Sequence, residues 1–151
     1  MRAVLQRVAR CVVSVEGCPP SSIGRGLLLL LGFTKHDRIE DLDKLLSKIV
    51  NLRLFVDEQG KMNRSLLEVG GGLMVVSQFT LYADCSRGRR PSFEQAAPPA
   101  VAEGLYKAFL AKAEALPLQV SKGFFGARMA VELLNDGPVT IVLEVPPEEQ
   151  E

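Results

Sequence analysis

Two hydroxyls and an amide lie close together in the run Ser77-Gln78-Phe79-Thr80, which ends an apolar stretch that predicts a strand. The end of a strand presents side chains and free backbone N–H groups to a site. A nucleophilic Ser77 or Thr80 would need a base, and the single histidine, His36, is far away in the sequence. If this strand end is catalytic, backbone N–H donors of Phe79 or Thr80 that stabilise an oxyanion are the better hypothesis. A polar strand exit without chemistry is the alternative.

A second group of interest is the segment 135–138, Asn-Asp-Gly-Pro, whose residue types predict a hairpin turn between strands at 128–134 and 139–145. The alternative is a cis peptide bond between Gly137 and Pro138. A cis bond would turn two neighbouring carbonyl oxygens the same way, so that they could accept hydrogen bonds from a substrate ammonium. Such oxygens would filter chirality, because the side chain of one enantiomer would collide with the backbone.

Three arginines, Arg87, Arg89 and Arg90, lie in the polar loop 84–92. Their guanidinium groups are either solvated or suited to phosphate contacts that position a polyanion without reading its sequence. Phe125 is the second of two adjacent aromatic residues. It belongs either to the core or to a surface that stacks on a nucleobase.

The composition excludes several classes of protein. Of the 151 residues, 47% are hydrophobic and 24% are charged, which is typical of one globular domain. The 18 basic and 18 acidic residues give zero net charge, so any contact with nucleic acid has to be a local patch. Three cysteines without a paired spacing and one histidine predict neither a disulfide framework nor a metal site. The apolar runs are too short to span a bilayer, and the N-terminal pattern is not that of a signal peptide, so we expect a cytoplasmic protein without membrane contact.

The elements that must position these residues are mostly strands. Apolar patterns predict strands at 3–8 and 11–15 (one strand or two joined by a bend), 26–33, 52–56, 73–79, 128–134 and 139–145. Helical spacing predicts two helices, at 38–50 and from 98 to about 116. We therefore expect residues 1–145 to form a single α+β domain with a mostly antiparallel, barrel-like sheet and two helices, followed by a disordered acidic tail at 146–151. Open sheet edges favour a symmetric homodimer.

Six stretches of the chain, in the same order, resemble the D-aminoacyl-tRNA deacylases. They are AVLQRV with the nearby SVEG, GLLLLLGF, DEQGKMN, VVSQFTLYAD, RGRRPSF and NDGPVTIVLEV. The resemblance extends to about residue 145. It implies a cytoplasmic, homodimeric enzyme without a cofactor that hydrolyses the ester bond of D-aminoacyl-tRNA, and of glycine mischarged onto alanine tRNA, and so releases the free amino acid and tRNA.

The resemblance also implies roles for individual residues. The catalytic motif of the family matches Ser77, Gln78, Phe79 and Thr80. The family's Gly-cisPro motif, which enters the partner's pocket and rejects L-amino acids, matches Gly137 and Pro138. Substrate-binding positions match Met129, in the pocket, and Arg7, which would hold the Gly-Pro segment. For the tRNA, we expect contacts from Arg87, Arg89, Arg90 and Phe125.

The expected mechanism needs no side-chain base. The ester is already activated by its vicinal ribose hydroxyl, so the protein has to orient it, stabilise the oxyanion and admit a water molecule. The ribose 2′-hydroxyl would carry the proton, whereas a covalent mechanism would use Thr80 as the nucleophile. Two other functions stay open: a non-catalytic dimeric nucleic-acid-binding module that uses the loop arginines, and a small-molecule hydrolase that uses Ser77 or Thr80.

Overall fold

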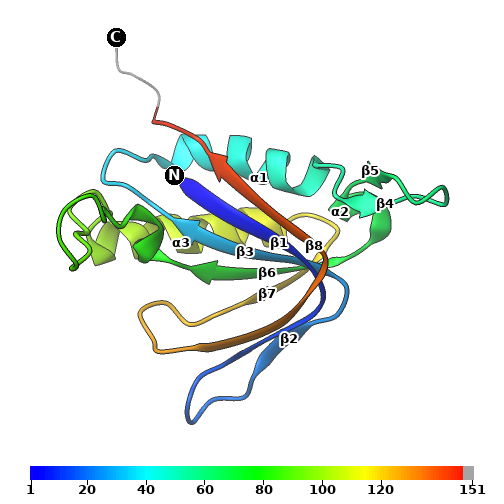
Figure 1. Cartoon of the computed structure of the whole chain (residues 1–151), viewed down its shortest axis with the longest axis horizontal. Helices are drawn as coiled ribbons and strands as arrows, with labels where there is room; N and C mark the ends of the chain where they lie inside the picture. Colours follow the sequence, from blue (N-terminus) through cyan, green and yellow to red (C-terminus); the bar gives the residue numbers. More distant parts are fainter. Residues whose placement is uncertain (148–151) are drawn as a thin grey trace.

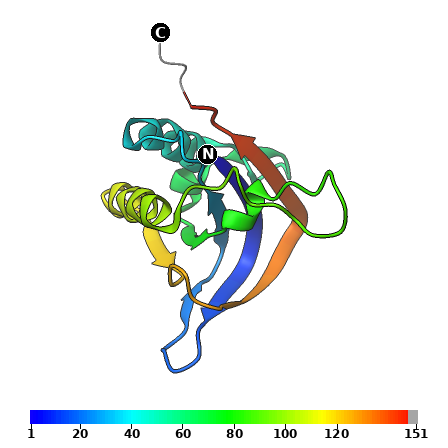
Figure 2. The same ribbon diagram turned by 90° about the vertical axis from the view of Figure 1, so that its left-hand side faces the viewer.

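A curved sheet with helices on one of its faces makes up the computed structural model, which describes residues 1–147 (Figures 1 and 2). The strands are β1 (Arg2–Ser14), β2 (Ser21–Ile23), β3 (Gly26–Gly32), β4 (Phe55–Val56), β5 (Met62–Arg64), β6 (Gly72–Ser77), β7 (Gln119–Lys122) and β8 (Ala130–Glu144). The helices are α1 (Leu42–Asn51), α2 (Leu66–Val69) and α3 (Pro99–Glu114), with 3₁₀ turns at Ile39–Asp41 and Phe79–Tyr82. The two long helices confirm the prediction, whereas β2, β5, α2 and β7 had no counterpart in it.

The sheet is mixed, and the expectation of a mostly antiparallel sheet is wrong. Strand β1 pairs antiparallel with β2, β3 and β8, but β3–β6 and β6–β7 are parallel pairs. Each parallel pair is joined through a long helix, α1 between β3 and β6 and α3 between β6 and β7. A helix that crosses back over the sheet is the usual connection between parallel strands, so this half of the fold consists of βαβ units.

The sheet is rolled into a nearly closed barrel, as expected for this α+β fold (Figure 2). Its short strand β2 comes beside β7, where the Ser121 hydroxyl donates a hydrogen bond of 3.1 Å to the Ser22 carbonyl. This contact lies outside the strand ladders and links the two sides of the roll.

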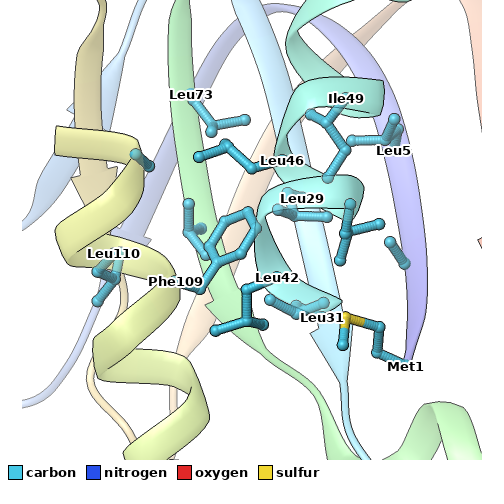
Figure 3. Packing of buried hydrophobic residues seen from close by; sticks show 14 of the residues in the cluster. Met1, Leu5, Leu29, Leu31, Leu42, Leu46, Ile49, Leu73, Phe109 and Leu110 are labelled. Atoms are coloured by element: carbon cyan, nitrogen blue, oxygen red, sulfur yellow. The ribbon is translucent and has the colours of Figure 1, made fainter. Parts of the chain in front are cut away.

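Both faces of β3 are buried, as its continuous apolar run predicts. Leu29 and Leu31 of β3 and Leu73 of β6 pack under the helices against Ile49 and Phe109 (Figure 3). The alternate residues of the same strands enter a second cluster on the other face; these are Leu28 and Met74, together with Val8, Cys11, Val13, Ile23 and Val76. The central strands are therefore fixed from both sides, so the ends of these strands are rigid supports for a site.

Strand β8 continues through the segment where a hairpin turn was predicted, so that prediction is wrong. The parts of β8 before and after this segment both pair with β1 rather than with each other. Gln6 pairs with Thr140 and Val8 pairs with Asn135, and the register shifts between these two pairs. The segment 135–138 therefore bulges out of the ladder instead of reversing the chain.

The N-terminal ammonium is buried beside the start of the sheet. The Met1 amine donates hydrogen bonds of 2.7 Å to Asp37 Oδ1 and to the Val145 carbonyl, and the other Asp37 oxygen accepts the Thr34 N–H at 2.7 Å. The last residues of the predicted acidic tail, 148–151, lie outside the described residues. No helix within residues 1–147 is long and apolar enough to cross a membrane.

Candidate functional site

A cavity of about 650 Å³ opens at the C-terminal end of β6. Ser77, Gln78 and Phe79 form one wall, and Phe125 and Met129 form the opposite wall from the segment between β7 and β8. The structure therefore brings together five of the residues that the sequence singled out. The start of α3 lies along the same cavity and contributes small apolar residues to it.

The cavity lies where β6 and β7 separate. Their parallel pairing ends at Val75 and Lys122, and the N–H of Gly123 still donates to the Val75 carbonyl at 3.0 Å. Glycine at position 123 permits a close approach, because a Cβ there would lie 2.7 Å from the sulfur of Met129. The Phe124 N–H donates to that sulfur at 3.3 Å. These contacts hold the segment after β7 against the end of β6 and so fix the two walls relative to each other.

The lining of the cavity is almost entirely apolar. Among the lining residues, all of which the structure describes, only Ser77 and Gln78 carry polar side chains, and none carries an ionisable group. His36 is exposed and is not among them. Within residues 1–147, no three His, Cys, Asp or Glu side chains gather as a metal-binding group. Residues 1–147 therefore bring no acidic or basic side chain to the cavity lining, while the backbone can supply hydrogen-bond donors.

Two backbone N–H groups at the edge of the cavity have no acceptor. In the 3₁₀ turn, the Leu81 N–H donates to the Gln78 carbonyl at 3.2 Å, but the N–H groups of Phe79 and Thr80 find no partner in the described part of the chain. Free N–H groups are expected in the first turn of a helix. Thr80 does not line the cavity; its hydroxyl accepts a hydrogen bond from the Gln78 amide. Preorganised N–H donors of this kind can stabilise an oxyanion.

The segment Asp136-Gly137-Pro138 is exposed, and its Gly-Pro peptide bond is cis. Arg7 holds the segment from beneath. Its Nε donates to the Asp136 carbonyl at 2.9 Å, and its Nη1 donates to the Leu54 carbonyl at 2.8 Å. Because the Arg7 side chain is only 10% exposed and binds two backbone carbonyls, it fixes the position of the segment.

Within one chain, the Gly-Pro segment is far from the cavity. Asn135 pairs with Val8, which in turn pairs with Gly26 at the start of β3, whereas Ser77 pairs with Leu31 near the end of β3. The five steps from residue 26 to residue 31 correspond to about 17 Å along the strand. Gly137, Pro138 and Arg7 are accordingly not among the residues that line the cavity.

The loop 84–92 projects from the protein with its three arginines exposed. Two backbone hydrogen bonds between Asp84 and Ser92, of 2.7 and 2.9 Å, close the base of the loop. Arg87, Arg89 and Arg90 form no ion pair with any residue in the range 1–147. They are therefore available to a polyanion.

The residue after this loop base, Phe93, was not predicted as part of the site. Its ring meets the Phe79 ring edge to face, with centroids 5.1 Å apart, and both rings line the cavity. The loop thus begins and ends beside the cavity. The residues from Ala96 to Pro99 were missed as part of the site as well, because small apolar residues at the entry to a helix have no periodic pattern.

A sequence profile of the family described as D-Tyr-tRNA(Tyr) deacylase matches residues 4–144. A relative from Azoarcus sp. (strain BH72), named D-aminoacyl-tRNA deacylase, is 56% identical over 147 residues, which cover 97% of each chain. A relative of the same name from Thermosipho africanus (strain TCF52B) is 54% identical over 144 residues, which cover 95% of this chain and 97% of its own.

Two solved structures share the fold. One, described as "c-Myc DNA Unwinding Element Binding Protein", is 44% identical with a TM-score of 0.90 and covers 97% of this chain and 99% of its own. The other, described as a probable eukaryotic D-amino acid tRNA deacylase, has a TM-score of 0.82 at 20% identity, covers 95% of this chain and 98% of its own, and is a likeness of fold alone. Together, the profile and the relatives show that this chain belongs to the D-Tyr-tRNA(Tyr) deacylase family.

Proposed function

We propose that this protein hydrolyses the ester bond of D-aminoacyl-tRNA, and of glycine mischarged onto alanine tRNA, and releases the free amino acid and tRNA. Membership of the family and the names of the relatives support this function. The observation that carries it is an apolar cavity that has free backbone N–H groups at its edge and no ionisable side chain. Such a cavity suits an ester that is already activated and needs orientation rather than a protein base. Because the proposed substrate is a tRNA, we propose that the enzyme works in the cytoplasm.

In the proposed mechanism, the terminal adenosine of the tRNA enters the cavity and its base stacks on Phe125. Ser77 and Gln78 orient the ester, and the N–H groups of Phe79 and Thr80 bind the oxyanion as it forms. A water molecule adds to the carbonyl carbon, and the bond to the ribose oxygen breaks. The proton from the water passes through the neighbouring ribose hydroxyl to the leaving oxygen, so no side chain has to accept it.

The chirality check is proposed to come from a second copy of the chain. The Gly-Pro segment is exposed and lies about 17 Å along the sheet from its own cavity, so the segment can reach a cavity only in a partner. Strand β8 carries the segment and, among the strands that the structure describes, pairs with β1 alone. It exposes Leu134 to 53% and Val142 to 64%. In a homodimer, these apolar side chains and the free edge of the strand would be covered.

Recognition by this segment would be steric. The carbonyl oxygens of Gly137 and Pro138 would hold the α-ammonium of the amino acid, with the segment kept rigid by Arg7. The side chain of an L-amino acid would collide with the backbone, whereas a D-amino acid or glycine would fit. Steric collision with a rigid backbone rejects the L-enantiomer, and no contact with the side chain of the D-enantiomer is needed.

The decisive experiment compares the release of D-tyrosine and L-tyrosine from charged tRNA, with the oligomeric state measured by analytical ultracentrifugation. We expect a dimer that releases D-tyrosine and spares L-tyrosine. No release of D-tyrosine would refute the proposed reaction, equal release of both would refute the chirality check, and a monomer that still discriminates would refute the cross-subunit arrangement.

A second experiment separates the two mechanisms. Under the orientation mechanism, Ser77→Ala and Thr80→Ala keep substantial hydrolysis, and tRNA ending in 2′-deoxyadenosine is a poor substrate. Near-total loss of activity in folded Thr80→Ala would instead support a covalent Thr80 nucleophile. Undiminished turnover of the deoxy substrate would exclude the proton path through the ribose.

A non-catalytic nucleic-acid-binding module is the second candidate. It is favoured by the description of the 44% identical structure as a DNA-unwinding-element-binding protein and by the three exposed arginines. It predicts salt-sensitive binding to many nucleic acids and no ester cleavage. A small-molecule hydrolase would need a base beside Ser77, and the cavity lining offers none. It would also be trapped by a serine-directed reagent and would ignore tRNA.

A further inference from the structure

Tyr106 lies in the middle of α3 and is 3% exposed. Its hydroxyl donates a hydrogen bond of 2.9 Å to the Val75 carbonyl, and the Gly123 carbonyl lies 3.5 Å away as a second acceptor. Burial raises the pKa of this hydroxyl to about 12, so it stays protonated as a donor at neutral pH. A single buried hydroxyl thus connects the helix to β6 and to the segment that follows β7.

The Val75 carbonyl marks the point where the cavity begins. Val75 forms the last pair of β6 with β7, and its oxygen accepts the Gly123 N–H at 3.0 Å in addition to the Tyr106 hydroxyl. Two donors from different elements therefore meet at one oxygen, two residues before Ser77. We therefore expect the loss of one of these hydrogen bonds to alter how β6 and the segment after β7 separate.

The ring of Tyr106 also supports the opposite wall. It lies beside the Phe125 ring, with centroids 5.9 Å apart and planes inclined by 38°. Phe125 is half-buried and also lines the cavity. Tyr106 therefore contacts the aromatic wall through its ring and the base of the same wall through its hydroxyl.

We propose that Tyr106 is a positioning residue that sets the place of Phe125 and thereby the affinity of the cavity for the terminal nucleoside of the tRNA. This inference rests on the proposed function, because it assigns the nucleoside to the Phe125 wall. Tyr106 does not line the cavity and acts only through the segment 123–125.

The first test is Tyr106→Phe, which keeps the ring and removes the hydroxyl. We expect KM for D-tyrosyl-tRNA to rise about 3- to 10-fold, the effect of one hydrogen bond, while kcat stays within about twofold. The reason is that the base contact is the same in the bound substrate and in the transition state. A fall in kcat at unchanged KM would overturn the proposal, since it would place the effect at Ser77 instead.

A double-mutant cycle tests whether Tyr106 acts through Phe125. Phe125→Leu removes the aromatic wall, so the double variant Tyr106→Phe/Phe125→Leu should have the KM of Phe125→Leu alone, whereas independent effects would multiply. The matched control is Tyr82→Phe, because Tyr82 is the other tyrosine and its hydroxyl has no hydrogen-bond partner in the described part of the chain. We expect both kinetic constants of this control to be unchanged, and effects that multiply in the cycle would contradict the proposal.

Hydrogen exchange separates this inference from the proposed function. In Tyr106→Phe, the amides of 123–127 should exchange faster, while those of β1 and β3 keep their wild-type rates. If the wild-type protein releases no D-tyrosine, the proposed function fails, but faster exchange confined to 123–127 still supports the positioning role. Unchanged exchange at 123–127 would overturn the positioning role whatever the activity.

Discussion

Arg7→Lys tests whether a fixed Gly-Pro segment is needed for activity. The guanidinium binds the carbonyls of Leu54 and Asp136 at 2.8 and 2.9 Å in different directions. A lysine ammonium at the end of a flexible stem keeps the charge but cannot reproduce this fork. We therefore expect one of the two hydrogen bonds to be lost and one of the two carbonyls, of which that of Leu54 is in the more buried contact, to be left without its donor.

The size of the effect follows from these contacts. A hydrogen bond from a charged group contributes about 1.5 to 3 kcal/mol, so the free energy of unfolding should fall by about 2 kcal/mol. For a chain of this length, that loss lowers Tm by about 4 to 8 °C. If the released segment no longer holds the substrate in place, kcat/KM for D-tyrosyl-tRNA should fall by about 10- to 100-fold.

Thermal unfolding followed by circular dichroism and release of D-tyrosine measure the two effects. Arg10→Lys is the matched control, because Arg10 lies on the same strand and forms an exposed ion pair of 2.8 Å with Glu132. That pair should contribute less than about 1 kcal/mol. The reasoning is refuted if Arg7→Lys melts and reacts like the control. A lower Tm with full activity would show that Arg7 stabilises the fold without positioning the segment.

Three further predictions concern other contacts. Asp37→Asn leaves the buried Met1 ammonium without its counter-ion, so urea denaturation should show a loss of about 3 to 5 kcal/mol; a loss below about 1 kcal/mol would contradict this. Replacing Arg89 and Arg90 by Gln should make tRNA binding less dependent on salt, with the logarithmic slope reduced by about 1 to 2 in filter binding, and an unchanged slope would disprove the phosphate contact. Burial raises the pKa of Tyr106 from 10.0 to about 12, so the folded state holds this proton more tightly than the unfolded state. The contribution of this protonated hydroxyl to the free energy of unfolding is complete below pH 10 and is lost as the pH rises from about 10 to about 12. The free energy of unfolding in urea should therefore fall less over that range for Tyr106→Phe than for the wild-type protein, and equal pH slopes for both proteins would exclude this linkage.

Local patterns were enough to predict the central elements of the fold. The run from Leu27 to Leu31 is apolar at every position, and both faces of β3 are indeed buried. The two long helices follow from their apolar stripes for the same reason, since burial on one side requires residues at helical spacing. These predictions need only the spacing of apolar side chains along a single strand or helix.

Pairing between elements could not be predicted in the same way. Strand β7, Gln119–Lys122, is short and mostly polar, so the second βαβ unit had no visible last strand. Without it, the strands did not alternate with helices, and the parallel pairs were mistaken for antiparallel ones. Turn-forming residues at 135–138 fit a hairpin and a bulge equally well, and only the register with β1 distinguishes the two.

Residues of both walls of the candidate site were singled out from the sequence, but the location of only one wall could be predicted. Ser77, Gln78 and Phe79 lie at the expected strand end, because a strand exit is marked by a change from apolar to polar residues. The facing wall depends on how α3 and the segment after β7 approach β6 in three dimensions. Phe93 and the small residues from Ala96 to Pro99 have no spacing that reveals this approach.

The lack of ionisable side chains around the cavity has a consequence for where such an enzyme can work. An enzyme that relies on a histidine or a carboxylate is switched off when the acidity of its surroundings crosses the pKa of that group. Here, the lining residues undergo no such change between mildly acidic and mildly alkaline conditions. The turnover profile would then follow the ionisation of the substrate's own amino group, and a cell under acid stress would keep its capacity to clear misacylated tRNA.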